Sequence, residues 1–241
     1  MLDLRELHIS IDKKKILSGI SAKALPGQLT LLLGDNGAGK TTLFNALTGR
    51  LEYESGEVYY NSELKSLEDE KYVNRISFIR NEGGTLPLLT IEEQLILKCR
   101  LYGVKNSEIK DRIENVITLF DLEKHRHYRS EELSSGFRKK LGIAMALVTD
   151  ADIYLFDEPF NSLDHKSTTA LVQIIDLLKT RGKIIILSTH TPSIIEKQTD
   201  RLWYLSASKI RESSDKEKIT KFINNISSKK DGISEMLKWI K

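Results

Sequence analysis

Short apolar runs alternate with stretches of helical periodicity along most of the chain. Seven of these runs are bounded by Gly, Pro, Asn or Asp, which is typical of β-strands. Several contain no polar residue, as expected for parallel strands that are covered on both faces. The predicted strands are residues 7–11, 29–33, 58–60, 76–79, 153–156, 184–187 and 202–205. The predicted helices are residues 41–47, 91–101, 108–120, 135–148 and 167–178. The pattern therefore predicts an α/β fold with a mostly parallel sheet.

The strands and helices are distributed unevenly, which predicts three parts. Residues 82–149 carry helical periodicity and no convincing strand, so we expect a helical subdomain inserted into an α/β core formed by residues 1–81 and 150–206. Residues 207–241 form a tail with two amphipathic patterns. The apolar positions of these patterns are Ile219, Phe222, Ile223 and Ile226, followed by Ile233, Met236, Leu237 and Ile240. The two tail helices either pack on the rest of the protein or contact a partner or a membrane surface.

Composition and charge narrow the class of protein. The 241 residues are 40% hydrophobic, which is enough for a packed core, and the formal net charge of +3 is too small to indicate nucleic-acid binding. The tail from residue 211 onward holds eight Lys/Arg and five Asp/Glu, so it carries this excess. A single cysteine, Cys99, argues against a disulfide framework. The first residues lack the pattern of a signal peptide, and we expect a cytoplasmic protein.

A glycine-rich loop follows the predicted strand at 29–33 and precedes the first predicted helix. The run reads Gly34, Asp35, Asn36, Gly37, Ala38, Gly39, Lys40, Thr41, Thr42. Glycines in such a loop let several backbone N–H groups point at one anion, and the helix N-terminus adds its dipole. Lys40 supplies a mobile cation for terminal phosphates, and the Thr41 hydroxyl suits Mg²⁺. This phosphate loop (residues 34–41) predicts binding of a nucleoside triphosphate with Mg²⁺.

Two adjacent acids end the predicted strand at 153–156. Asp157 is placed to reach the metal shell, and Glu158, on the other side of the pleat, to polarise a water molecule in line with the γ-phosphate. A carboxylate in that place acts as a general base. Together with the phosphate loop, the pair predicts hydrolysis of the triphosphate.

Three further motifs make the chain resemble a known family. Leu133-Ser134-Ser135-Gly136-Phe137 (the signature segment) opens a predicted helix about twenty residues before Asp157. Ser162-Leu163-Asp164 follows Glu158, and His190 ends the run Ser188-Thr189-His190. In this order and spacing, the five motifs are similar to those of the nucleotide-binding domain of ATP-binding cassette (ABC) proteins. The resemblance covers roughly residues 2–210.

The resemblance implies a P-loop NTPase core, an antiparallel β N-terminal part and the inserted helical subdomain. It implies a head-to-tail dimer that buries two ATP molecules, each between Lys40 of one chain and Ser134, Ser135 and Gly136 of the other. By the same resemblance, His190 contacts the γ-phosphate and the attacking water, and Asp164 lies in the dimer interface. ATP and Mg²⁺ are the implied cofactors.

Three positions depart from the family pattern. Asn81 stands nearest to the glutamine that usually reaches Mg²⁺, and it has one methylene fewer than glutamine. Phe137 replaces the glutamine that often ends the signature. Counting back from Ser21 places Ile11 where an aromatic residue usually stacks on adenine, so we expect an aliphatic contact with the base there.

The leading hypothesis is the ATPase subunit of a membrane transporter, bound to a separate integral membrane subunit on the cytoplasmic face. A homodimer is expected, and a heterodimer is left open. The alternative is an ABC ATPase without a membrane subunit that acts on ribosomes, nucleic acid or protein complexes; such proteins usually carry two cassettes, coiled coils or zinc modules, and this chain shows one cassette. A small-molecule kinase would not need the signature segment or His190.

Overall fold

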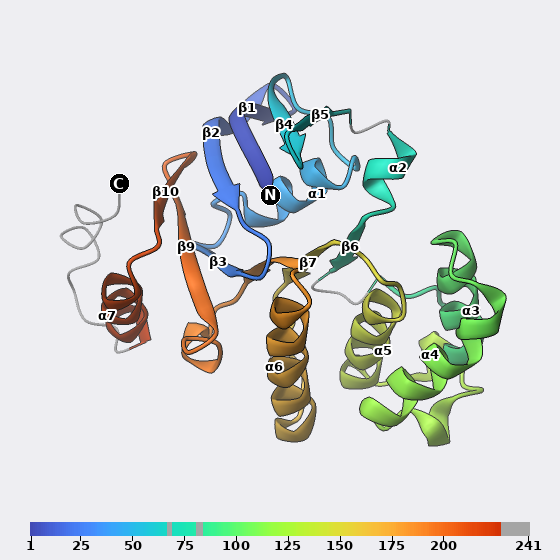
Figure 1. Ribbon diagram of the computed structural model, residues 1–241. Helices are drawn as coiled ribbons and strands as arrows, with labels where there is room; N and C mark the ends of the chain where they lie inside the picture. Colours follow the sequence, from blue (N-terminus) through green and yellow to red (C-terminus); the bar gives the residue numbers. More distant parts are fainter. Residues whose placement is uncertain (67–68, 81–83, 228–241) are drawn as a thin grey trace.

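Two β-sheets form the framework of the protein, and α-helices surround the larger one (Figure 1). The computed structural model describes residues 1–66, 69–80 and 84–227. The strands are β1 (Leu2–Ile11), β2 (Lys14–Ala24), β3 (Leu29–Gly34), β4 (Ser55–Tyr60), β5 (Glu63–Lys65), β6 (Ile76–Ile79), β7 (Ile153–Asp157), β8 (Ile184–Ser188), β9 (Thr199–Ser206) and β10 (Lys209–Ser213). The helices are α1 (Lys40–Leu47), α2 (Glu70–Val73), α3 (Ile91–Leu101), α4 (Asn106–Leu119), α5 (Ser135–Leu147), α6 (His165–Thr180) and α7 (Lys216–Ser227). Short 3₁₀ helices are η1 (Glu123–His125), η2 (Ser130–Glu132) and η3 (Pro192–Ile194).

The larger sheet has the strand order β10-β9-β3-β8-β7-β6, and all neighbours except β10 and β9 are parallel. Its central strands are buried on both faces: Leu31 and Leu33 belong to one core cluster, whereas Leu32 belongs to the other. This double burial explains why the strands read as continuous apolar runs. The predicted α/β fold with a mostly parallel sheet is confirmed.

The smaller sheet has the order β2-β1-β4-β5 and is antiparallel throughout. It packs with α1 against one face of the larger sheet, and Phe44 and Leu47 of α1 lie in the shared core. The antiparallel N-terminal part that the resemblance implies is therefore present. Helix α1 lies between the two sheets, directly after the phosphate loop (Figure 1).

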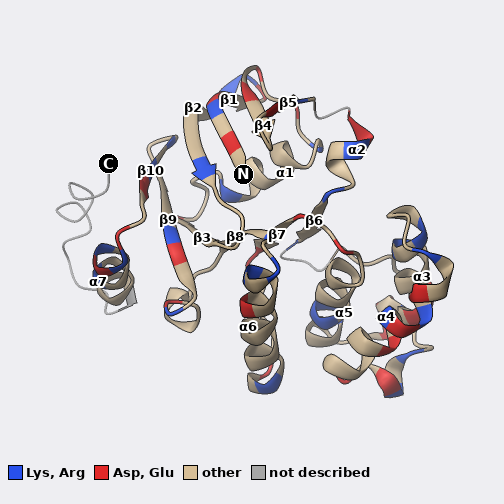
Figure 2. Ribbon diagram, in the orientation of Figure 1, with Lys and Arg blue, Asp and Glu red and all other residues tan. Residues whose placement is uncertain are grey.

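Helices α3, α4 and α5 lie together at one end of the molecule (Figure 1). Helix α3 begins with a capping box, in which Thr90 and Glu93 each accept a backbone N–H of the other. Basic and acidic residues are interspersed along the ribbon of this part (Figure 2), and Arg126 pairs there with Glu92 and Glu123, each at 3.2 Å. That residues 82–149 form a separate subdomain remains a prediction. Helix α5 shares its hydrophobic core with the larger sheet, so the structure does not separate it from the α/β core.

The first of the two expected tail helices is α7. It buries Ile219, Phe222 and Ile223, and the Phe222 ring meets the Tyr204 ring of β9 edge-on at 5.1 Å between centroids. The second expected tail helix, with Ile233, Met236, Leu237 and Ile240, lies outside the described residues. Across the described ranges, no helix combines the length and the apolar content that are needed to span a bilayer.

Candidate active site

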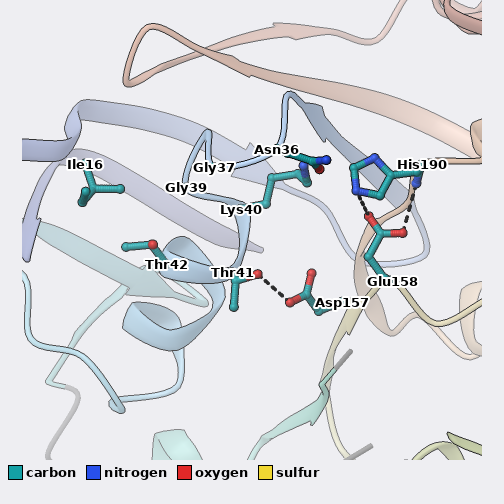
Figure 3. A pocket seen from close by; sticks show the side chains of 10 residues that line it. All are labelled: Ile16, Asn36, Gly37, Gly39, Lys40, Thr41, Thr42, Asp157, Glu158 and His190. Atoms are coloured by element: carbon teal, nitrogen blue, oxygen red, sulfur yellow. Dashed lines mark hydrogen bonds and ion pairs between the residues drawn. The ribbon is translucent and has the colours of Figure 1, made fainter. Parts of the chain in front are cut away.

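A cavity of about 300 Å³ lies where β3 ends and α1 begins, beside the carboxyl ends of β7 and β8 (Figure 3). Parallel strands bring their carboxyl ends to one edge of the sheet, so segments far apart in the sequence meet there. The lining residues are Ile16, Asn36, Gly37, Gly39, Lys40, Thr41, Thr42, Asp157, Glu158 and His190. The phosphate loop, the acidic pair and His190, which the sequence singled out separately, therefore share one site.

The phosphate loop leads directly into α1. Gly39 caps this helix with φ of 108°, and a Cβ there would lie 2.8 Å from Leu17 Cδ2, so a side chain would be both strained and obstructed. The Lys40 ammonium donates to the carbonyl oxygens of Gly34, at 2.7 Å, and Asp35, at 3.1 Å. Burial lowers the pKa of Lys40, while the nearby Glu158 and Asp157 oppose that shift. The loop thus holds a cation and a helix N-terminus at the wall of the cavity.

The Asp157 carboxylate is held by two hydroxyl groups. Thr41 Oγ1 donates to Asp157 Oδ2 at 2.7 Å, and Ser188 Oγ donates to Asp157 Oδ1 at 2.7 Å (Figure 3 draws the first bond). A threonine hydroxyl and a carboxylate are hard oxygen donors of the kind that Mg²⁺ prefers, and both line the cavity. The two residues therefore fit a divalent cation bound with a triphosphate.

Glu158 and His190 form a pair beside this position. Their side chains meet at 3.2 Å between His190 Nε2 and Glu158 Oε1, and the His190 backbone N–H donates to Glu158 Oε2 at 3.0 Å (Figure 3). The Glu158 side chain is 6% exposed, and burial raises its pKa, although His190 and Lys40 oppose the shift. A buried carboxylate with a raised pKa at the wall of a cavity suits a general base.

The backbone of Glu158 has φ of 49°, in the left-handed region that glutamate rarely adopts. Its N–H donates to the carbonyl oxygen and to Oγ of Ser188, both at 3.2 Å. A left-handed conformation of a non-glycine residue lowers the stability of the fold, and such conformations are concentrated at functional sites. The neighbouring strand β8 therefore supports an unfavourable conformation that points Glu158 at the cavity.

The signature segment does not line this cavity within its own chain. Ser134 caps α5 by accepting the N–H of Phe137 at 3.3 Å, and Ser135 and Gly136 form the first turn of that helix. A Cβ at Gly136 would lie 3.0 Å from the Ser162 carbonyl oxygen, so the signature segment closely approaches the segment that leads to Asp164.

Asp164 caps α6 and pairs with α5. Its carboxylate accepts the N–H of Ser167 at 2.8 Å and lies 2.7 Å from Lys140 Nζ. The Lys140 ammonium and the Ser167 N–H hold the pKa of this carboxyl well below its usual range. The Asp164 side chain is 54% exposed, so one edge of it faces outward from the chain.

The contacts expected of Ile11 and Asn81 are not among those that this cavity shows. Ile11 does not line the cavity: it ends β1, is 40% exposed, and precedes the tight turn at Asp12 and Lys13, both with positive φ. Ile16, on the returning strand β2, lines the cavity in its place. Asn81 lies outside the described residues. The adenine contact expected of Ile11 stays a prediction, and the aliphatic side chain that lines the cavity is on β2.

Ser188 is a site residue that the sequence analysis did not assign. It lies opposite Asp157 in the parallel β7–β8 register, which allows its hydroxyl to reach that carboxylate. The only signal in the sequence was its place at the end of an apolar run, two residues before His190.

The ABC transporter family model matches residues 17–161, which is more than half of the chain. The chain belongs to the ABC transporter family. Among similar curated proteins, the ABC transporter ATP-binding protein NatA of Bacillus subtilis is 33% identical over 193 residues, 78% of each chain. ABC transporter A family member 11 of Dictyostelium discoideum is 35% identical over 201 residues, 82% of this chain, and the match spans 24% of that longer protein.

Solved structures of other proteins have the same fold as this ABC chain. A structure described as the ATP-binding subunit of an ABC transporter superposes with a TM-score of 0.87 at 24% identity, over 95% of this chain and 98% of the other. A second structure is described as an ATP-binding cassette in a dimeric, post-hydrolysis state with ADP and Pi. It superposes with a TM-score of 0.79 at 24% identity, over 89% of this chain and 98% of the other.

Proposed function

We propose that this ABC chain binds and hydrolyses ATP as the nucleotide-binding subunit of a membrane transporter. The observation that carries the proposal is the Thr41–Asp157 hydrogen bond at 2.7 Å, in the same cavity as Lys40, Glu158 and His190. These side chains include a cation for phosphate, two oxygen donors for a metal and a carboxylate base. NatA, a relative of similar length, is named as a transporter ATP-binding protein, which favours this function over a kinase.

Each residue has a distinct role in the proposed reaction. The backbone N–H groups of residues 35–39 and the Lys40 ammonium bind the phosphates, while Thr42 lies at the cavity wall one residue further along α1. Thr41 and Asp157 would hold Mg²⁺, which when bound neutralises charge on the β- and γ-phosphates. Glu158 accepts a proton from the attacking water, and His190 orients Glu158 and contacts the γ-phosphate.

We further propose that two chains bind head to tail with two ATP molecules between them. Ser134, Ser135 and Gly136 lie at a helix N-terminus, which suits a phosphate, and they are absent from the lining of their own chain's cavity. The γ-phosphate of an ATP molecule bound to a second copy could accept hydrogen bonds from this helix N-terminus. Asp164 would then lie in the dimer interface, close to the helix that begins with the signature segment, because it pairs with Lys140 of α5. The dimeric state of the post-hydrolysis cassette supports this arrangement.

The proposed partner is an integral membrane subunit on a separate chain, with this protein at the cytoplasmic face of the membrane. We propose a homodimer, because one chain supplies every proposed catalytic and phosphate-binding residue; a heterodimer is the alternative. No role for nucleic acid is proposed. An ABC ATPase that acts on ribosomes or soluble complexes is the competing function, and the transporter subunits among its relatives disfavour it.

Affinity capture tests the partner directly. Glu158→Gln removes the proposed base but keeps the shape of the side chain, so with ATP and Mg²⁺ it should accumulate the closed dimer on its partner. We expect a polytopic membrane protein to be recovered from detergent-solubilised native cells with Glu158→Gln, and not with Lys40→Ala. Recovery of ribosomes or of non-membrane proteins alone would contradict the transporter function.

A further inference from the structure

Lys139 is a buried cation outside the cavity. It lies in the second turn of α5, three residues after Gly136, and is 3% exposed. Burial lowers its pKa to about 8, although the negative charges of Asp157 and Glu158 favour the protonated form. Placing an ammonium group in a protein interior costs several kcal/mol before its contacts are counted. A buried lysine at this position therefore needs an explanation other than packing.

Two hydrogen bonds of Lys139 within the described residues join three elements. Its Nζ donates to the Arg80 carbonyl oxygen at 3.2 Å and to the Asp157 carbonyl oxygen at 3.5 Å. Arg80 follows β6 and Asp157 ends β7, and these strands are parallel neighbours in which Ile79 pairs with Phe156. The ammonium group therefore connects the ends of two strands to the helix that carries the signature segment.

One peptide group receives support at both of its ends. The peptide between Asp157 and Glu158 accepts a hydrogen bond from Lys139 at its carbonyl oxygen. Its N–H donates to the carbonyl oxygen and to Oγ of Ser188. This peptide leads into the residue with φ of 49°, so its orientation determines where the Glu158 side chain points. Opposed hydrogen bonds of this kind can maintain an otherwise unfavourable backbone conformation.

We propose that Lys139 is a positioning residue for ATP hydrolysis, which holds the Asp157–Glu158 peptide and ties it to the first turns of α5. The inference rests on the proposed hydrolysis at Glu158 and adds a residue that does not touch the substrate. Because α5 also presents Ser134 and Gly136, Lys139 links the geometry of the base to the segment proposed to bind the second ATP.

Replacement of Lys139 by methionine separates positioning from packing. Methionine keeps an unbranched apolar stem but donates no hydrogen bond, and its burial carries none of the desolvation cost of an ammonium group. We expect Lys139→Met to lower kcat for ATP by about tenfold or more, since small misplacements of catalytic groups are costly. The KM for ATP should stay within about twofold, because the phosphate loop is untouched, and Tm should not fall.

Two further variants complete the test. Lys166→Met removes an exposed lysine that pairs with Asp121 on the surface, and it should leave kcat unchanged. Lys139→Gln restores two N–H donors without the charge and should recover part of the lost kcat. A kcat within threefold of the wild type in Lys139→Met would overturn the proposal. A loss of kcat that follows a lowered Tm in both Lys139 variants would also overturn it. Absence of ATP hydrolysis in the wild type would instead contradict the proposed function.

Discussion

Glu158 combines a buried carboxylate, a left-handed backbone conformation and nearby positive charges. Its folded-state pKa is raised by burial, so the folded protein favours the protonated form. The stability that this preference contributes is fully present below the ordinary pKa of 4.5 and is lost as pH rises through the raised folded-state value. At neutral pH the ionised carboxylate therefore lowers the free energy of unfolding.

The destabilising effect of the ionised Glu158 carboxylate leads to a prediction for Glu158→Gln in the absence of nucleotide. The neutral amide should raise Tm by about 2–4 °C at pH 8, which corresponds to about 1 kcal/mol for a chain of this size. The gain should shrink as pH falls toward 4.5, since the wild-type carboxyl becomes neutral too. Thermal unfolding at several pH values measures the difference, with Glu131→Gln as the exposed control. An equal gain at every pH would show that ionisation of Glu158 is not its source.

Local motifs in the sequence were sufficient to select residues that the structure brings together, although their catalytic roles stay predictions. The phosphate loop, Asp157 and Glu158 were predicted from local motifs and His190 from the resemblance to ABC proteins, and the structure brings residues of all of them to one cavity. Ser188, Ile16 and Lys139 were not predicted, because their roles depend on strand register and helix packing that no local pattern encodes. Lys139 in particular is the middle one of three consecutive basic residues, and nothing in that run marks it as buried.

Elements that are buried on two sides were the easiest to predict. The seven predicted strands lie within β1, β3, β4, β6, β7, β8 and β9. Strand β2 was missed because Gly19 and several polar residues interrupt its apolar pattern, and β5 and β10 because they are short, polar edge strands. Edge strands carry little hydrophobic signal, since water covers much of their surface.

Helix α7 gives a prediction at the scale of an element. The Phe222 side chain is 1% exposed and meets Tyr204, so Phe222→Ala should lower the free energy of unfolding by about 3–5 kcal/mol. Lys221→Ala, which changes the exposed face of the same helix, should have little effect. Urea unfolding measures both variants. Equal stability in the two would mean that α7 does not contribute to the fold and is available for a partner.

At the scale of the whole molecule, the separate positions of the cavity and the signature segment favour the proposed head-to-tail dimer. The cavity with Lys40 and Glu158 and the helix N-terminus with Ser134 and Gly136 belong to different parts of the chain. Two copies in head-to-tail orientation would bring each cavity to the signature segment of the other. ATP would then stabilise the dimer increasingly as its concentration rises above its Kd, and hydrolysis would release the dimer.

The most direct test of this account is the molar mass of Glu158→Gln with and without ATP and Mg²⁺, measured by light scattering after size-exclusion chromatography. We predict a monomer without nucleotide, a dimer with ATP and Mg²⁺, and a return to monomer with ADP. Ser135→Arg, which would obstruct the second phosphate site, should remain monomeric with ATP while it still binds nucleotide. A monomer of Glu158→Gln under saturating ATP and Mg²⁺ would contradict the proposed dimer, as would a dimer that does not depend on nucleotide.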